Sequence, residues 1–161
     1  MNETTERPRF TGKFKYTDEE GGYGLWIPSG WHRTDLADGR QGVIFSPYPN
    51  DLNTCFMAER QALDVSIKPK DLAILRKGFL QGLESLPGIE IESHEESVGS
   101  AGVILLEARF TFLEGEERRK RWVRVSYWGN GQLTFIAQGA SEEIFDYWVP
   151  AFYNIMMTVE L

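Results

Sequence analysis

Residues 104–112 read Ile104-Leu105-Leu106-Glu107-Ala108-Arg109-Phe110-Thr111-Phe112. Apolar side chains alternate here with a more polar set, and this period of two is typical of a strand that buries one face. After a turn at 114–117, a second run alternates through 123–127, and Gly-Asn-Gly at 129–131 predicts a tight hairpin that leads into a third run at 133–137. Large apolar residues also lie on the opposite face, namely Trp122, Trp128 and Ile136. We therefore predict an antiparallel meander that is covered on both sides.

Two amphipathic helices are predicted around this meander. The first spans 69–86, because Pro69 suits an initial helical turn and apolar residues then recur at steps of three and four, namely Leu72, Leu75, Phe79, Leu83 and Leu86. The second spans 141–158, with Ser141 as its N-cap and a broad apolar stripe. Pro150 lies inside this second helix and predicts a bend there.

Shorter strands are predicted upstream of the first helix. They are placed at 10–16, 23–27, 43–46, 54–59 and 63–67, with a polar loop at 32–42. The fold class is therefore α+β: an α/β/α sandwich whose central twisted antiparallel sheet of about six or seven strands carries one helix on each face. Residues 10–161 are expected to form a single domain, preceded by a flexible N-terminus at 1–9.

Composition limits the possible functions. The 161 residues include 17 Lys and Arg and 24 Asp and Glu, so the net charge is −7. An acidic chain of this kind is not expected to bind nucleic acid or an anionic membrane. With a single cysteine, Cys55, an internal disulfide is impossible. The chain contains neither a signal-like N-terminus nor a membrane-length apolar run, so we expect a cytoplasmic protein that does not insert into membranes.

The sequence contains no catalytic signature. Its two histidines, His32 and His94, are far from Cys55 in the chain, and Cys55 lies in a predicted strand, where a buried free thiol is common. The glycines at 21–24 join two strands and lack the Lys-Ser/Thr pair of a phosphate-binding loop. We therefore expect a protein that is not an enzyme and uses no cofactor.

One segment has side chains that can bind a metal ion. On a regular strand, Glu90, Glu92 and His94 would share one face and present two carboxylates and an imidazole. Ile89 and Ile91 occupy the other face, so the same pattern also describes an ordinary solvent-exposed face. We favour the exposed face and keep a metal-assisted hydrolase as the least favoured hypothesis.

A basic run offers the main candidate for a partner-binding surface. It contains Arg118, Arg119, Lys120, Arg121 and Arg124, and Trp122 lies within it. Arg and Trp together are typical of interaction hot spots. Glu114, Glu116 and Glu117 directly precede the run, however, so cross-strand pairing could neutralise it, and we favour this local compensation. Trp31, at the start of the polar loop, is expected either to plug the core or to line a groove.

Several segments resemble a known family. Residues 16–31, Tyr-Thr-Asp-Glu-Glu-Gly-Gly-Tyr-Gly-Leu-Trp-Ile-Pro-Ser-Gly-Trp, resemble the opening of PsbP-like proteins, which have an aromatic strand, a Gly-Tyr/Phe turn and a Pro-x-x-Trp exit. Residues 75–88 are similar to the family's middle helix with its Leu-Pro-Gly turn, 107–110 to its central strand and 148–161 to its closing helix. The resemblance covers about residues 10–161 and implies the PsbP-like sandwich.

The resemblance also implies a class of function. The family includes an extrinsic subunit of photosystem II, a Ran-binding nuclear-import factor, bacterial lipoproteins and secretion chaperones, which share binding to macromolecules and no common reaction. It implies a non-catalytic protein-binding or chaperone-like module with an unknown partner, as a monomer or homodimer. The alternative is a small-molecule carrier or sensor, with a pocket between the sheet and the last helix lined by Phe145, Trp148 and Phe152.

Overall fold

The computed structural model describes residues 12–161, so the predicted flexible segment 1–9 and the strand residue Phe10 lie outside the described part. That division of the chain therefore stays a prediction. In chain order the elements are β1 (Lys13–Asp18), β2 (Tyr23–Pro28), β3 (His32–Asp35), β4 (Gln41–Ser46), β5 (Cys55–Ile67), a 3-10 turn η1 (Pro69–Asp71), α1 (Leu72–Glu84), β6 (Glu90–Val98), β7 (Ile104–Glu114), β8 (Glu117–Gly139) and α2 (Glu142–Met157).

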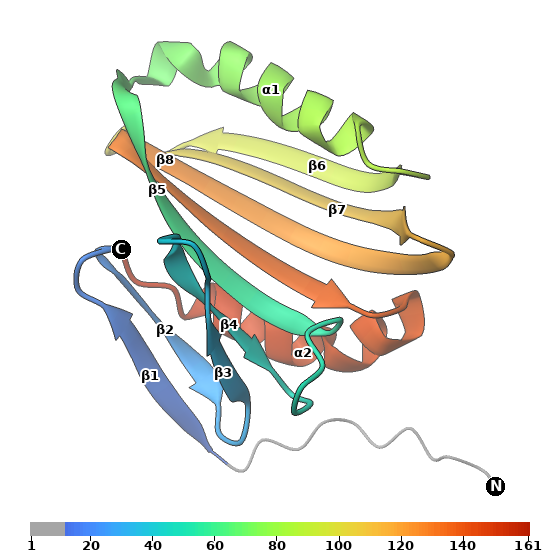
Figure 1. The fold of residues 1–161 in the computed structure, drawn as a ribbon. Coiled ribbons are helices and arrows are strands. Elements are labelled where there is room, and N and C mark those ends of the chain that lie inside the picture. Colours follow the sequence, from blue (N-terminus) through green and yellow to red (C-terminus); the bar gives the residue numbers. More distant parts are fainter. Residues whose placement is uncertain (1–11) are drawn as a thin grey trace, which may run out of the picture.

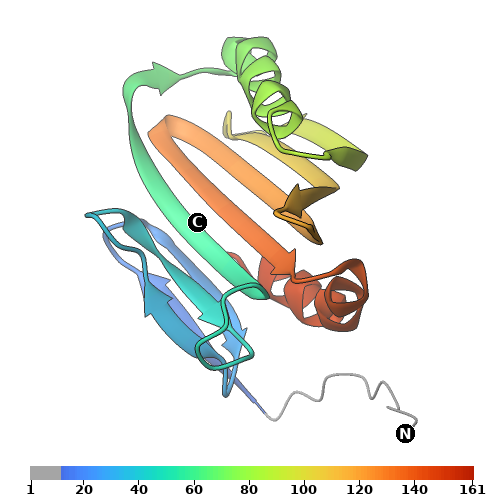
Figure 2. The ribbon, with the colours of Figure 1, turned by 45° about the vertical axis from the view of Figure 1, so that its right-hand side comes forward.

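The main sheet is antiparallel throughout and has the strand order β3-β4-β5-β8-β7-β6. The long element β8 folds back on itself, as the two adjacent orange ribbons in Figure 2 show. Its first arm pairs with β7 up to Tyr127, and its second arm pairs with β5 from Gly131 onward. Gly129 lies between the arms with a φ of 53°, a backbone conformation that favours glycine. The predicted hairpin is confirmed.

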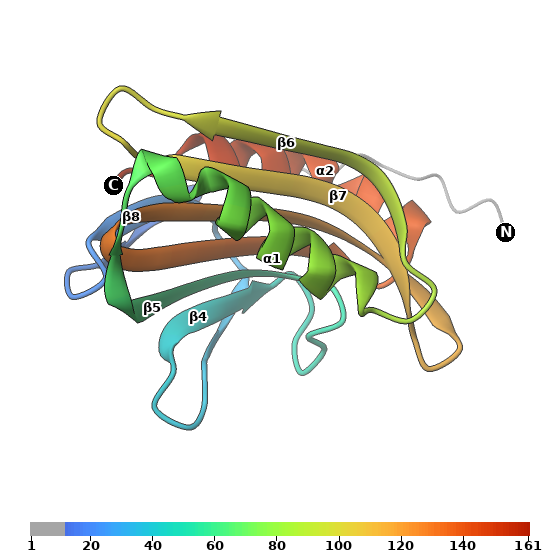
Figure 3. The same cartoon turned by 90° about the horizontal axis from the view of Figure 1, so that it is seen from above.

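The helices lie on opposite faces of this sheet, as predicted (Figures 1 and 3). On the α1 side, the buried residues of the core are Leu83, Ile104, Leu106, Ala108, Phe110, Phe112, Val123, Val125 and Tyr127. On the α2 side they are Tyr23, Leu25, Ile27, Val43, Phe45, Phe56, Ala58, Trp122, Leu133, Phe135, Ala137, Phe145, Phe152, Ile155 and Met156. The alternation at 104–112 therefore points its apolar set toward α1.

The N-terminal hairpin departs from the predicted arrangement, because β1 and β2 form a separate two-stranded sheet. This hairpin packs beside α2 and contributes Tyr23, Leu25 and Ile27 to the α2-side core. Its backbone is tied to the end of the chain by the paired bonds Gly24 N to Glu160 O (2.9 Å) and Glu160 N to Gly24 O (2.8 Å). Residues far apart in sequence thus close one side of the sandwich.

Two other boundaries differ from the prediction. The polar loop at 32–42 contains a short edge strand, β3, which pairs with β4. The strands predicted at 54–59 and 63–67 form one continuous strand, β5, with an irregularity between Ala62 and Ile67. Long-range pairing with β4 and β8 supplies the partner hydrogen bonds in both places, and the local pattern does not contain that information.

Helix ends follow the local signals closely. Pro69 opens the 3-10 turn before α1, and Asp71 Oδ2 accepts a hydrogen bond from Lys68 N at 2.8 Å. Ser141 caps α2 by accepting a bond from Ile144 N at 3.2 Å, as predicted. The helix α2 continues past Pro150 to Met157. Among residues 12–161, no helix has the length and apolar character needed to span a membrane.

Candidate functional site

The predicted basic run lies on the first arm of β8, where its side chains alternate between the two faces of the sheet. Arg119 and Arg121 lie opposite Phe112 and Phe110 of β7, so they share the face that α1 covers. Trp122 lies on the α2 side, and the alternation places Lys120 and Arg124 there too. A run that looks continuous in the sequence is therefore divided between two surfaces.

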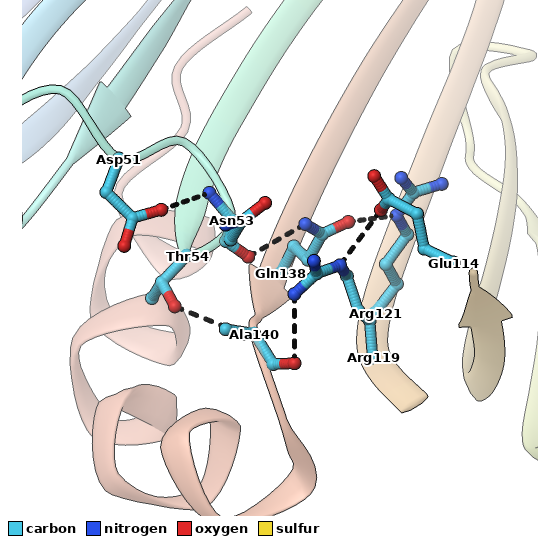
Figure 4. Close-up of polar contacts among 8 residues, drawn as sticks. All are labelled: Asp51, Asn53, Thr54, Glu114, Arg119, Arg121, Gln138 and Ala140. Atoms are coloured by element: carbon cyan, nitrogen blue, oxygen red, sulfur yellow. Dashed lines mark hydrogen bonds and ion pairs between the residues drawn. The ribbon is translucent and has the colours of Figure 1, made fainter. Parts of the chain in front are cut away.

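Arg119 and Arg121 are held in a polar network at the end of the sheet (Figure 4). Arg119 Nε donates to Glu114 Oε2 at 2.9 Å, and its Nη1 donates to Ala140 O at 3.1 Å. Arg121 Nε donates to Gln138 Oε1 at 2.6 Å, and Gln138 Nε2 donates to the backbone oxygen of Asn53 at 2.8 Å. Burial lowers the pKa of Arg121. These two arginines join β8 to the β4–β5 loop and to the turn before α2.

Arg118 and Lys120 are neutralised by the edge strand β6. Lys120 Nζ lies 3.0 Å from Glu92 Oε1, and Arg118 Nη1 lies 3.9 Å from Glu90 Oε2. Arg118 also donates to Gly88 O at 2.9 Å. The expected partners of the run were Glu114, Glu116 and Glu117, but only Glu114 of these pairs with it in the described structure. The other carboxylates come from Glu90 and Glu92 of β6 and from Glu107 of β7.

Trp122 is the centre of a cluster on the α2 side. Its side chain is only 2% exposed, and its Nε1 donates to Glu107 Oε1 at 2.5 Å. The guanidinium of Arg109 lies 4.3 Å from the centre of the Trp122 ring, and Tyr153 of α2 stacks on the same indole with ring centres 6.3 Å apart. Arg124 Nε lies 3.6 Å from Glu107 Oε2. Trp122 is therefore too buried to be a contact residue, and it positions Glu107 and Arg109.

Beside this cluster, a groove follows the α2-side face of β6 and β7, and the C-terminal end of α2 forms a wall at one end of it. We call it the β6–β7 groove. One end is a hollow of about 410 Å³ lined by Ser97, Gly99, Val103, Leu105, Arg124, Ser126, Phe135, Met156, Met157, Val159 and Leu161. The other end is a hollow of about 490 Å³ lined by Glu92, Ser93, Glu95, Glu107 and Arg109. A small hollow lined by Glu95, Glu96, Ser97, Leu105 and Glu107 shares Ser97 and Leu105 with the first and Glu95 and Glu107 with the second.

The groove is apolar at one end and acidic at the other. At the apolar end, Met157 is 51% exposed and Leu161 is 63% exposed, although both are large hydrophobic residues. At the acidic end, the strand register sets Glu95 directly opposite Glu107. The Glu107 carboxylate contacts Trp122 and Arg124, whereas the Glu95 carboxylate has no ion-pair or hydrogen-bond partner among residues 12–161. This combination suits a ligand with one apolar part and one cationic part.

A second large hollow, of about 670 Å³, lies between β1 and the β3–β4 hairpin. Its arginines are already engaged: Arg33 Nε lies 2.9 Å from Asp35 Oδ1, and Arg40 Nε lies 2.7 Å from Glu59 Oε2. Local ion pairs therefore satisfy both arginines of this surface. The β6–β7 groove is the stronger candidate because its large apolar side chains, Met157 and Leu161, are more exposed than Phe14, the most exposed large apolar residue that lines this hollow.

The metal-ligand pattern on β6 is interrupted by a bulge. Between Ile91 and Ser93 the register with β7 shifts, so Glu92 is the extra residue. Glu90 lies opposite Thr111 and His94 opposite Ala108, which puts these two on opposite faces. The expectation that Glu90, Glu92 and His94 share a face is therefore wrong. Among residues 12–161, no three acidic, histidine or cysteine side chains come together as a metal site.

The environment of Cys55 does not favour nucleophilic attack by its thiol. It is buried at the start of β5, and burial raises the pKa of its thiol to about 11. A thiol with this pKa is protonated at neutral pH and is a poor nucleophile. His32 and His94 lie on the exposed edge strands β3 and β6.

The side chain of Trp31 packs against the α2-side core, as the first of its two predicted alternatives describes. Its ring meets Trp148 edge to face at 5.5 Å between centres and lies 6.2 Å from Phe152. Phe145 and Phe152 are buried in the α2-side core, so they do not offer a free pocket wall. A hollow between the sheet and the last helix does exist, but it lies at the C-terminal end of α2, near Met156 and Met157.

The sequence interpretation missed several groove residues. Leu105, Glu107 and Arg109 form the second, more polar face of the strand at 104–112, which had been treated as an ordinary covered face. Met156 and Met157 lie in the helix predicted at 141–158, whose apolar stripe was expected to pack in the core. The polar residues that alternate along this central strand were the available signal for an open face, because a strand covered on both faces is usually apolar on both.

Comparison with solved structures agrees with this architecture. The chain is similar to cyanobacterial PsbP (CyanoP) of Synechocystis sp. PCC 6803, with a TM-score of 0.65 and 16% identity over 97% of this chain and 98% of that chain. LpqN of Mycobacterium tuberculosis, which is involved in cell envelope biogenesis, gives 0.59 and 14% over 92% and 89%. The Ran-binding protein Mog1p of Saccharomyces cerevisiae gives 0.53 and 8% over 92% and 95%.

Sequence comparisons add no further relatives: no family model and no curated protein matches the chain. The matches with the three solved structures cover 92–97% of this chain. At identities of 8–16% it concerns the fold alone. The chain has the PsbP-like fold, which confirms the architecture that its sequence resemblance predicted.

Proposed function

We propose that this protein is a non-catalytic module that binds a protein partner in the β6–β7 groove. The observation that carries the proposal is the incomplete cover on the α2 side of the sheet. The helix packs mainly on β8 and β2, and the hollows beside it stay open to solvent over β6 and β7. A groove that combines apolar and charged walls is typical of surfaces that recognise polypeptides.

Two further features support a binding role. Cys55 is buried and its thiol pKa is raised, which argues against covalent catalysis at this residue. The fold is also shared with a protein described as Ran-binding, for which partner recognition is the stated property. Groove binding and a chaperone-like role are compatible, because both require an accessible apolar surface next to polar side chains.

Site-specific photocrosslinking in the native host tests this proposal. A benzophenone amino acid at Met157 lies in the groove, and the same amino acid at Val65, which is 64% exposed on β5, serves as the matched control. We expect a discrete crosslinked protein from position 157 that is absent from position 65. Identical products from both positions, or none from position 157, would contradict groove binding.

The small-molecule alternative retains one specific observation in its favour. The hollow of about 410 Å³ lies between the sheet and the last helix and is large enough for a small apolar ligand. Native mass spectrometry of gently purified protein distinguishes the two functions. A carrier is expected to show a bound mass that is lost in a Met157→Asp variant, whereas a protein-binding module shows only the mass of the free chain.

A further inference from the structure

The acidic end of the groove contains an electrostatic conflict that the chain does not resolve by itself. Glu95 and Glu107 lie directly opposite each other on adjacent strands, and like charges in this position destabilise a sheet. Glu107 is compensated by Trp122 Nε1 and Arg124, but Glu95 has no such contact among residues 12–161. A cation placed between the two carboxylates would remove the repulsion.

The neighbouring arginine does not provide this cation. Arg109 lines the acidic hollow, but its guanidinium lies over the Trp122 ring and forms no ion pair within residues 12–161. Three carboxylates and this one guanidinium line the acidic hollow, namely Glu92, Glu95, Glu107 and Arg109. Lys120 pairs with Glu92 and Arg124 pairs with Glu107, so Glu95 is the carboxylate left without a cation among residues 12–161. The net charge of −7 adds a long-range attraction for a basic ligand.

The size of the hollow favours a side-chain cation over a metal ion. The acidic groups around it do not converge on one point, since no three possible metal ligands come together among residues 12–161. A hollow of about 490 Å³ instead accommodates the ammonium or guanidinium of a lysine or arginine. A guanidinium has five N–H donors, so it can donate to two neighbouring carboxylates.

The apolar end lies a short distance along the same strands. Ser97 and Leu105 form the next pair on this face after Glu95 and Glu107, which is about 7 Å away at the usual rise of a strand. The apolar end is lined by Met156 and Met157, whose flexible side chains adapt to apolar groups of different shapes. An extended segment spans this distance in two residues, and a helical one in four or five.

We propose that the β6–β7 groove binds a basic-apolar segment of a partner protein. A lysine or arginine of this segment lies between Glu95 and Glu107, and a large apolar residue about 7 Å away contacts Leu105 and Met157. This inference rests on the proposed function and specifies the chemistry of the partner. Addition of the segment as a further strand on β6 is disfavoured, because the bulge at 91–93 and the exposed glutamates protect that edge.

Selection from a phage-displayed library of random 12-residue peptides tests the inference. We expect the enriched peptides to contain Lys or Arg two to five positions from a large apolar residue. Synthetic copies are then measured by fluorescence anisotropy against wild type, Glu95→Lys, Met157→Asp and Glu116→Lys. Glu116→Lys is the matched control, because Glu116 is exposed in the β7–β8 turn, outside the groove.

The expected result is a loss of affinity of at least about fivefold in Glu95→Lys and in Met157→Asp, with a change below about twofold in Glu116→Lys. If only Met157→Asp weakens peptide binding, the inference of a basic partner is wrong, whereas binding in the groove is still supported. Peptides that bind all variants equally overturn both ideas. No enrichment overturns the inference, because an open groove with these walls requires no folded partner, whereas the crosslinking experiment still decides the proposed function.

Discussion

Gly139 determines how closely α2 can approach the sheet, and its replacement by alanine tests that packing directly. Gly139 is buried at the end of β8, just before α2 begins. A Cβ added there would lie 2.5 Å from both the backbone N and the Cα of Phe145, and 2.6 Å from its Cβ. Two of these neighbours are backbone atoms, so a rotamer change cannot relieve the contact, and α2 or β8 must shift.

The expected size of the effect follows from this geometry. Overpacking a well-filled core destabilises a protein by about 1–3 kcal/mol, and a clash with backbone belongs in the upper part of that range. For a domain of this length, we expect Gly139→Ala to lower the melting temperature by about 5–10 °C. Gly82→Ala is the matched control, since a Cβ there meets no atom within 4 Å and Gly82 lies inside α1. It should stabilise the protein by about 1 kcal/mol.

Thermal unfolding and urea unfolding, both monitored by far-UV circular dichroism, measure the two variants against wild type. The same substitution is expected to lower stability at position 139 and to raise it at position 82, so the comparison controls for any general effect of replacing glycine by alanine. If Gly139→Ala unfolds at the same urea concentration as wild type, α2 does not pack on the sheet as described. The α2 wall of the β6–β7 groove would then also be misplaced.

Three further predictions concern the core and the site. Leu106→Ala, on the buried α1-side face, should destabilise the protein by about 2–4 kcal/mol, whereas Leu105→Ala in the groove should cost less than about 1.5 kcal/mol. Equal losses of stability in urea unfolding would contradict the register of β7. Trp122→Phe removes the indole donor to Glu107 and should destabilise by about 1–3 kcal/mol, and a change below about 0.5 kcal/mol would show that this bond has little value. Burial raises the pKa of Cys55 from 9.0 to about 11, because the folded state disfavours the thiolate. The protonated thiol therefore contributes about 2–3 kcal/mol to the free energy of unfolding, fully below pH 9, and this contribution is lost as the pH rises from 9 to 11. In Cys55→Ala this part of the alkaline loss should disappear, and an unchanged pH profile would refute it.

The groove could not be located from the sequence, although about half of its residues belong to correctly predicted elements. Glu107 and Arg109 lie on a strand whose existence and alternation were predicted. Their role depends on Trp122 and Tyr153, which come from another strand and from the last helix. Alternation shows that these residues share a face, but it does not show what covers that face.

The β6 segment shows the same limit. Its glutamates were recognised as a cluster, but a regular strand was assumed, so Glu90, Glu92 and His94 were placed together. The bulge at 91–93 depends on how β6 pairs with β7, and it turns His94 to the other face. Similarly, the basic run was seen as one surface, whereas β8 divides it between two faces and β6 neutralises part of it.

The sequence by itself determined the elements and their buried faces: the meander, the Ser141 cap, the Pro69 helix start and the two amphipathic helices. These depend on neighbours two to four residues apart, which any one segment contains. Only the tertiary structure decided the separate β1–β2 sheet, the bulge in β6, and how far α2 extends over β6 and β7. These features are set by packing between segments far apart in the chain, so the groove beside α2 appears only when the sheet is assembled.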